Sequence, residues 1–318
     1  MMGLEIPKQR YSGKVVQTMF GADREHGGTR GKTYVIGGSD SLPFHAFESE
    51  RIVTPLIGME VVDTLRGIDD VSKASMGDII EDPVRWARTC ENEWNADFIN
   101  VKLKSANPEE ENRSPEECAS LVSEILKATT LPLVIYGCGS AEKDAKVIDA
   151  VSQAAAKERV FLGPADQDNY KTIAAAALSN GHGVIGFANL DINIAKQIVI
   201  LLMDFGVRRE DIMVDPLQAA LGMGIEYTYS TLERLRNGAL MGDQSLQVPM
   251  ICDCSVAFTA REAIEMNPDM GDTLERAINW ETITAHTSLL AGVDLIVVRH
   301  PESLKRVKKI LSSLTGGA

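Results

Sequence analysis

The sequence of 318 residues lacks any long apolar run. No stretch approaches the roughly 18 uninterrupted apolar residues that a membrane span needs. Residues 1–14 have no apolar centre of the kind found in a secretory signal peptide. We therefore expect a cytoplasmic protein with no membrane partner.

Cysteine is scarce, and the five cysteines form no evenly spaced framework. They stand at positions 90, 118, 138, 252 and 254, so only Cys252 and Cys254 are close in sequence. An iron–sulfur cluster usually needs four thiolates with a local run such as C-x₂-C-x₂-C. The spacing predicts no disulfide framework and no cluster in this chain.

Short motifs of several enzyme classes are also missing. The five histidines show no H-x-x-x-H or H-E-x-x-H spacing, which makes a zinc hydrolase improbable. The chain has no P-loop, no G-x-S-x-G elbow and no G-x-G-x-x-G after a first strand.

Basic residues are fewer than acidic residues. The chain has 32 Lys and Arg against 45 Asp and Glu, which gives a formal charge of −13 and a pI near 4.9. An acidic surface repels nucleic acid and anionic membranes, so we expect neither as a partner. The 44% of hydrophobic residues is enough for a large core.

From residue 54 onward, short β-rich apolar runs alternate with helical patterns, which is typical of a parallel sheet. Eight such units favour an α/β fold of the (β/α)₈ TIM-barrel type over residues 54–318. The predicted strands are 56–61, 98–103, 133–136, 160–162, 183–187, 212–214, 250–252 and 295–298.

Residues 1–53 do not fit this repeat. The runs 15–19 and 34–36 flank a glycine-rich segment and predict an N-terminal β-hairpin extension that plugs the bottom of the barrel. Residues 63–81 are predicted to be a long loop.

Helix starts are marked independently of the strands. Ser114 begins a capping box with Pro115 at the first helical position, and Asp82 precedes Pro83 in the same way. Asp191 and Pro301 mark two further starts.

The ligand face of such a barrel is formed by the carboxyl ends of the strands and the loops that follow them. Polar or glycine residues at these places are therefore candidates for a site. They are Glu60, Lys102, Lys104, Gly137, Cys138, Gly139, Asn189, Asp191, Asn193, Asp215, Cys254, Arg299 and His300.

Most of these residues also have a purely structural interpretation. The turn of Gly137, Cys138 and Gly139 either lets backbone approach a flat ligand or is simply a tight turn. Asp191 is first of all a helix N-cap. Cys252 and Cys254 alternate along one strand, so both are expected to point into the barrel as core residues.

Two features after the sixth strand favour a ligand more directly. Asp215 ends that strand and is expected to face the mouth, although no partner base is visible. Residues 221–230 combine the flexible Gly222 and Gly224 with Tyr227, which suits a loop that covers a bulky ligand.

Four runs in the chain, residues 37–48, 55–60, 221–227 and 233–240, resemble the small (delta) subunit of the corrinoid iron–sulfur protein. That protein belongs to the acetyl-CoA synthase/carbon monoxide dehydrogenase system of the reductive acetyl-CoA pathway. The resemblance covers nearly the whole chain, in order.

The resemblance implies a heterodimer with a large (gamma) subunit that carries a [4Fe–4S] cluster and most contacts to a shared, base-off cobalt corrinoid. The cobalt takes a methyl group from methyltetrahydrofolate on a separate methyltransferase and delivers it to acetyl-CoA synthase. This chain would be a non-catalytic subunit. Its expected corrinoid contacts are Gly137, Cys138, Asp191, Asn193, Gly222, Gly224, Tyr227, Arg299 and His300.

Two other functions stay open. An autonomous pterin-dependent methyltransferase would use Asp215 and Asn189 to hold the pterin, although the full set of pterin-binding Asp and Asn residues is not evident. A metal-dependent barrel lyase or aldolase would need a catalytic lysine, for which Lys102 and Lys104 are the candidates.

Overall fold

The computed structural model describes residues 7–45, 47–49 and 53–316. Two strands, β1 (Gln17–Phe20) and β2 (Tyr34–Gly37), pair antiparallel as a hairpin. The barrel strands are β3 (Leu56–Val62), β4 (Ile99–Lys102), β5 (Leu133–Tyr136), β6 (Phe161–Ala165), β7 (Gly183–Phe187), β8 (Ile212–Asp215), β9 (Ile251–Asp253) and β10 (Leu295–Val298).

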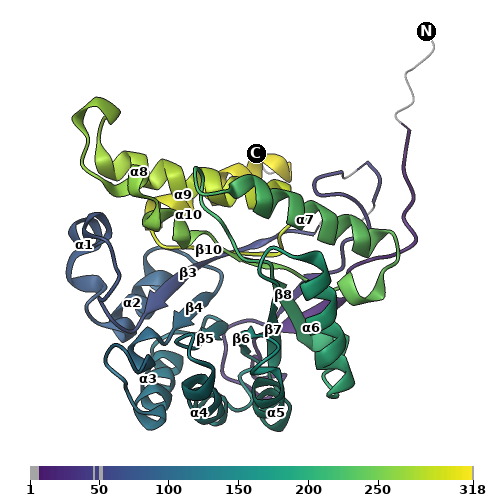
Figure 1. The fold of residues 1–318 in the computed structure, drawn as a ribbon, viewed down its shortest axis with the longest axis horizontal. Coiled ribbons are helices and arrows are strands. Elements are labelled where there is room, and N and C mark those ends of the chain that lie inside the picture. The colour runs from purple at the N-terminus through teal and green to yellow at the C-terminus, as the bar shows by residue number, and fades with distance from the viewer. Residues whose placement is uncertain (1–6, 46, 50–52, 317–318) are drawn as a thin grey trace.

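The eight barrel strands are all parallel and form a nearly closed (β/α)₈ barrel (Figure 1). Their order in the sheet runs from β8 through β7, β6, β5, β4 and β3 to β10 and β9. A parallel bridge between Val214 and Met250 connects the two ends of this sheet. The predicted fold class is confirmed.

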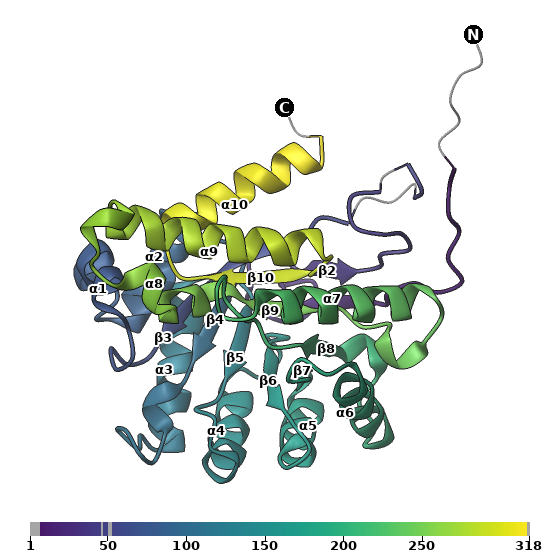
Figure 2. The same cartoon turned by 45° about the horizontal axis from the view of Figure 1, so that its top comes forward.

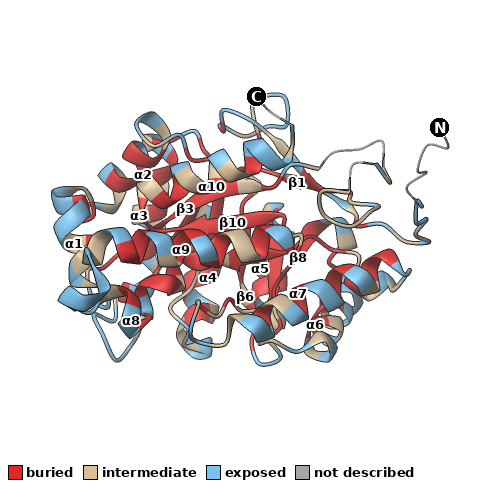
Figure 3. Cartoon of the chain, turned by 90° about the horizontal axis from the view of Figure 1, so that it is seen from above, coloured by how far each residue is buried: buried red, intermediate tan, exposed pale blue. Residues whose placement is uncertain are grey.

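Ten helices in the described part of the chain surround the barrel (Figure 1). They are α1 (Asp70–Met76), α2 (Pro83–Asn92), α3 (Pro115–Ala128), α4 (Ala141–Ala154), α5 (Tyr170–Asn180), α6 (Ile192–Asp204), α7 (Ile225–Leu240), α8 (Arg261–Ile264), α9 (Thr273–Leu290) and α10 (Pro301–Leu314). Figure 3 shows that burial is concentrated in the strands and on the inner faces of these helices. No described helix is both long and apolar enough to cross a membrane.

The hydrophobic core has two main parts, one on each side of the barrel wall. The larger lies between strands and helices and contains residues such as Ile57, Val101 and Ile296. The smaller lies inside the barrel and contains Phe98, Phe161 and their inward-facing neighbours. Because side chains alternate along a strand, strands such as β6, β7, β8 and β10 contribute to both parts.

The hairpin closes the amino-terminal end of the barrel. Phe20 is fully buried and belongs to the inner core. Its ring meets those of Phe98 and Phe161 edge to face, with centroid distances of 5.6 Å and 5.7 Å. The predicted plug is thus present, and an aromatic cluster attaches it to the barrel.

The predicted helix starts are confirmed by their hydrogen bonds. Ser114 and Glu117 form both halves of the capping box, and the side chain of Asp82 accepts bonds from the backbone of α2. Asp191 accepts a hydrogen bond from the backbone of Asn193, and Pro301 opens α10. Each strand was predicted within three residues of its observed bounds.

Two predictions were wrong. Residues 63–81 are not a plain loop, because Asp69 caps the helix α1 within them. Cys252 and Cys254 do not point into the barrel. Both belong to the outer core, and Cys254 lies 3.9 Å from the hydroxyl of Ser288 on α9. Ile251 faces the interior, so the alternation places Asp253 there instead.

Replacing Phe20 with alanine should lower the free energy of unfolding by about 3–5 kcal/mol, because it leaves a cavity in the inner core. Val35→Ala on the same hairpin should cost less than about 0.5 kcal/mol, since Val35 is 57% exposed. Urea denaturation followed by circular dichroism measures both values. A loss for Phe20→Ala as small as the one expected for Val35→Ala would show that the hairpin does not support the barrel.

Candidate functional site

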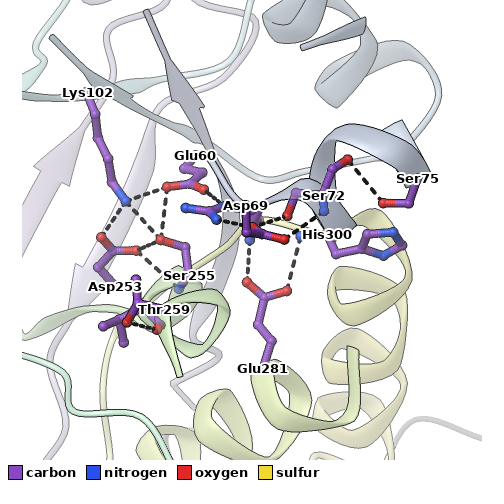
Figure 4. Close-up of polar contacts among 12 residues, drawn as sticks. Glu60, Asp69, Ser72, Ser75, Lys102, Asp253, Ser255, Thr259, Glu281 and His300 are labelled. Carbon is purple, nitrogen blue, oxygen red and sulfur yellow. Dashed lines mark hydrogen bonds and ion pairs between the residues drawn. The ribbon is translucent and has the colours of Figure 1, made fainter. Parts of the chain in front are cut away.

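Charged side chains from four neighbouring strands meet at the carboxyl-terminal mouth of the barrel (Figure 4). Glu60 comes from β3, Lys102 from β4 and Asp253 from β9, and Arg299 follows β10 directly. Each of them lies an even number of positions along the chain from a position of the inner core. Side chains alternate along a strand, so these side chains also point inward. Together with Asp69 and Ser255 they form what we call the mouth network.

Glu60 is the centre of the mouth network. One carboxylate oxygen accepts a bond of 2.5 Å from the ammonium group of Lys102 and one of 2.9 Å from the hydroxyl of Ser255. The other oxygen accepts from Nε of Arg299. Glu60 is fully buried, so these bonds replace the water that its charge would otherwise require.

The two cations each hold a second carboxylate. Lys102 lies 2.5 Å from Asp253. The guanidinium of Arg299 donates to Asp69 over 2.8 Å and lies 5.4 Å from the centroid of Phe258. Asp69 is also the N-cap of α1, so the network connects four strands to the helix that was missed in the sequence.

The charges of the network stabilise one another. Burial alone would raise the pKa of Glu60, but Arg299 and Lys102 outweigh it and hold that pKa below its usual range. Burial would lower the pKa of Lys102, yet Asp253 and Glu60 raise it. Lys102 therefore stays an ammonium ion, which argues against its use as a nucleophilic amine.

A second buried carboxyl supports the chain just after β10. Glu281 on α9 accepts hydrogen bonds from the backbone N–H groups of Arg299 and His300, at 2.5 Å and 3.1 Å. Burial raises the pKa of Glu281 to about 8. These bonds fix the start of α10 and with it the position of the Arg299 side chain.

Tyr136 and Asp215 form a separate pair across the mouth. The phenol of Tyr136, at the end of β5, donates to Asp215 at the end of β8 over 2.8 Å. Burial raises the pKa of Asp215 to about 6, and the phenol and the N–H of Leu217 act in the opposite direction. This carboxyl can therefore change charge near neutral pH.

Asn100 lies two residues before Lys102 on β4, so its side chain points to the same inner face, and it is fully buried. Neither its amide oxygen nor its amide nitrogen has a hydrogen-bond partner among the described residues. A buried amide without partners is unusual in a folded protein.

Around this polar interior, the loops after β8 and α8 and the first turn of α7 expose large apolar side chains. Met223 is 51% exposed, Tyr227 66% and Met266 86%. Trp280 donates to the carbonyl of Leu221, and both Trp280 and Ile264 pack against a small cluster made of Ala220, Ala257, Ala260 and Ala263. We call the exposed residues Met223, Tyr227 and Met266 the rim.

The residues predicted as corrinoid contacts occupy several different places. Asp191 and Asn193 are exposed at the start of α6. Gly222 and Gly224 lie between β8 and α7 and both have positive φ, and Tyr227 lies in the first turn of α7.

The other four predicted contacts are buried or closely packed against other residues of the chain. A Cβ on Gly137 would meet the Asp144 carboxylate at 2.4 Å, and the N–H of Cys138 donates to the same group. Burial raises the pKa of Cys138 to about 12, so it is a thiol. Arg299 and His300 are buried. Contact of all nine residues with a corrinoid stays a prediction.

Sequence reasoning missed Tyr136, Asp253, Asp69 and Glu281. Tyr136 could have been found, because it ends the predicted strand 133–136, whereas Asp253 was hidden by the wrong inward assignment of Cys252. Asp69 and Glu281 lie in a loop and on a helix, where no strand period applies. The residues that the structure describes include no group of three or more His, Cys, Asp or Glu side chains able to hold a metal ion.

A family model described as "CO dehydrogenase/acetyl-CoA synthase delta subunit" matches residues 18–300. The chain belongs to this delta-subunit family. It is similar to the acetyl-CoA decarbonylase/synthase complex subunit delta of Methanopyrus kandleri, with 34% identity over 307 residues, covering 96% of this chain and 76% of the relative. The same subunit of Methanothermobacter thermautotrophicus is 35% identical over 311 residues, covering 97% and 78%.

Among solved structures, this delta-family chain resembles dihydropteroate synthases. The Yersinia pestis enzyme in a sulfonamide drug complex has a TM-score of 0.59 at 14% identity, covering 83% of this chain and 95% of that one. The Xanthomonas albilineans enzyme with 7,8-dihydropteroate has a TM-score of 0.58 at 15% identity, covering 82% and 94%. At such low identity the likeness shows a shared barrel fold.

Replacing Arg299 with methionine should lower the free energy of unfolding by about 3–5 kcal/mol, because it leaves Glu60 and Asp69 short of a buried partner. Arg306→Met is the matched control, since that arginine pairs with the exposed Glu275 and should cost less than about 1 kcal/mol. Guanidinium denaturation of both variants tests this. A loss below 1 kcal/mol for Arg299→Met would contradict a structural role.

Asp215 should titrate with a pKa of about 6, and Tyr136→Phe should move this value higher, because the phenol hydrogen bond favours the carboxylate. Carboxyl ¹³C shifts measure the titration, with Asp215→Asn to identify the signal. The folded pKa lies above the unfolded value of about 3.9, so this group costs stability as pH rises from about 4 through 6. Asp215→Asn should remove that loss. A midpoint near 4 would be evidence against the buried pair.

Proposed function

We propose that this chain is the small subunit of a heterodimeric corrinoid iron–sulfur protein. The complex would carry a methyl group on cobalt from methyltetrahydrofolate and its methyltransferase to acetyl-CoA synthase. The large subunit would hold the [4Fe–4S] cluster and most of the corrinoid contacts, and this chain would cover the corrinoid with its barrel mouth. The family relationship carries the proposal, because relatives named as complex subunit delta match 95% or more of the chain.

The mouth fits a broad, flat, largely apolar ring. Gly222 has open space where a Cβ would stand, with only Trp280 at 3.9 Å, and Gly139 has nothing within 4 Å. A flat molecule can therefore approach the backbone at both loops. Met223, Tyr227 and Met266 add exposed apolar surface, and methionine adapts its shape to the surface it contacts.

In this role the corrinoid supplies the cobalt that accepts and releases methyl. The rim side chains cover the ring and exclude water from it. The mouth network keeps Lys102 and Arg299 paired with carboxylates, so neither cation is free to attack or to bind a substrate anion.

One observation favours the rival function, an autonomous pterin-dependent methyltransferase. Asn100 and Asp215 place an unpartnered amide and a titratable carboxyl on the inner wall of the mouth, which is the kind of chemistry that a pterin ring needs. Asn189, which was predicted for this role, is exposed in the loop after β7. The two proposals differ in what they predict for the isolated chain, because only the rival function requires that it transfer methyl groups without a large subunit.

Copurification with the presumed large subunit tests the proposal. We expect corrin absorption and cobalt in the stoichiometric pair and neither in the isolated chain. The double variant Met223→Ser/Tyr227→Ser should speed loss of corrinoid from the pair roughly tenfold, because it removes apolar contact area worth about 1.4 kcal/mol. Dialysis followed by the visible spectrum measures the loss.

Met241→Ser is the matched control. Met241 is 68% exposed but lies at the opposite end of α7, at the base of the barrel, so it should leave corrinoid retention unchanged. Equal retention by the rim variant and the control would remove the rim from the proposal. A colourless isolated chain that methylates added cobalamin from methyltetrahydrofolate, and loses this activity in Asp215→Asn, would establish the rival function.

A further inference from the structure

Three side chains on one side of α9 hold both of the loops that carry the rim methionines. Residues 216–224, between β8 and α7, are the first rim loop, and residues 265–272, between α8 and α9, are the second. Arg276, Trp280 and Thr284 follow one another at intervals of four residues, so they lie along one side of the helix. Figure 2 shows that α8 and the start of α7 both run beside α9. The two loops therefore share one support.

The second rim loop is held by the guanidinium of Arg276, which is 8% exposed. It donates to four backbone carbonyl groups, those of Glu262, Glu265, Met270 and Gly271. The bonds to Glu262 and Met270 are 2.8 Å and 3.2 Å long. Since Glu265 directly precedes Met266 and Met270 follows it, the backbone is fixed on both sides of this exposed side chain. The planar fork of donors in arginine suits such a task.

The first rim loop is held at Leu221. The indole of Trp280 donates to the carbonyl of Leu221 over 2.8 Å, and the N–H of Leu221 donates to the hydroxyl of Thr284 over 3.3 Å. The N–H of Met223 then closes a turn on the carbonyl of Ala220 over 2.9 Å. Both backbone groups of the residue two positions before Met223 are thus bonded to α9.

The rim combines exposed side chains with a fixed backbone. Loops at the ligand end of a barrel are commonly among its more mobile parts. Here Met223 is 51% exposed and Met266 86%, although the backbone beside each is bonded to side chains of α9. Loops that are ordered before binding lose little further freedom when a ligand covers them, so ordering subtracts less from the binding free energy.

We propose that α9 holds the two rim loops as one preformed platform, with Arg276 and Trp280 as positioning residues that act through Met266 and Met223. The rim then meets the corrinoid as a fixed surface and does not close over it as a lid. The identity of the ligand rests on the proposed function, whereas the order of the platform is a property of the isolated chain. Two separate experiments therefore test them.

Hydrogen exchange of the isolated full chain tests the platform itself. We expect the amides of Met223 and Met270 to exchange at least about tenfold more slowly than in the unfolded chain, because both are hydrogen-bonded within their loops. Trp280→Phe should reduce the protection in the first rim loop alone, and Arg276→Gln in the second alone. Loop amides that exchange at the unfolded rate in the wild-type chain would overturn the proposal, whatever the ligand.

Loss of corrinoid from the pair with the large subunit tests how the platform acts. Arg276→Gln should speed this loss about threefold, a change typical of losing hydrogen-bonded support. In a Met266→Ser background the same substitution should have no further effect, and in a Met223→Ser background it should keep its full effect. Trp280→Phe should show the reverse pattern. A general loss of stability cannot produce this pairing, because it would act in both backgrounds alike.

Arg30→Gln is the matched control. Arg30 is also buried and also donates to backbone carbonyls, those of Leu126, Thr129 and Leu131, but it lies between the hairpin strands at the opposite end of the barrel. This variant should lower stability and leave corrinoid retention unchanged.

The positioning role is overturned if Arg276→Gln has the same effect in both methionine backgrounds, or if Arg30→Gln loses corrinoid as fast as Arg276→Gln. If the wild-type pair holds no corrinoid, the proposed function fails together with the ligand. Hydrogen exchange then decides whether the platform exists.

Discussion

The mouth of this barrel depends on the burial of one carboxylate, Glu60, which has no exposed surface. An ion in that position is tolerated only where cations and hydrogen-bond donors replace its water. Lys102 and Arg299 do so from the two strands that flank β3 in the sheet. Because each cation then reaches a further carboxylate, one buried charge determines the arrangement of β3, β4, β9, β10 and α1.

This arrangement decides which parts of the mouth can interact with a ligand. Lys102, Arg299 and their carboxylates are committed to one another, so the charged interior is closer to a structural support than to a binding surface. Groups with remaining capacity are the amide of Asn100, the carboxyl of Asp215 and the apolar rim. A mouth of this kind suits a partner that brings its own reactive centre.

The sequence predicted the strands well because apolar runs and helix caps are local signals. Ser114, Asp82 and Asp191 act on backbone groups within three residues, and each cap was found where it was expected. The inward direction of a side chain is harder to predict on a short strand. Placing Cys252 instead of Asp253 inside the barrel was a one-residue error, and it reversed the polarity of that position.

The candidate site was only partly predictable, for a different reason. Glu60, Lys102, Asp215 and Arg299 could be identified because each ends or follows a strand. Their pairing could not, since the partners are up to 239 residues apart and the choice depends on strand order. Asp69 reaches the network from the loop before α1, and Glu281 on α9 supports it by accepting from the backbone of Arg299 and His300. A residue that joins a site from outside the repeat carries no periodic mark in the sequence.

Asp215 behaves differently from Glu60, although both are buried acids at the same mouth. Glu60 has two cations within bonding distance, whereas Asp215 is influenced by Lys102, which is already bonded to Glu60 and Asp253. The hydrogen bonds from Tyr136 and Leu217 offset only part of the cost of burial, so Asp215 binds a proton at about pH 6. The network thus keeps Glu60 and Lys102 charged, whereas Asp215 can change its charge in response to what enters the mouth.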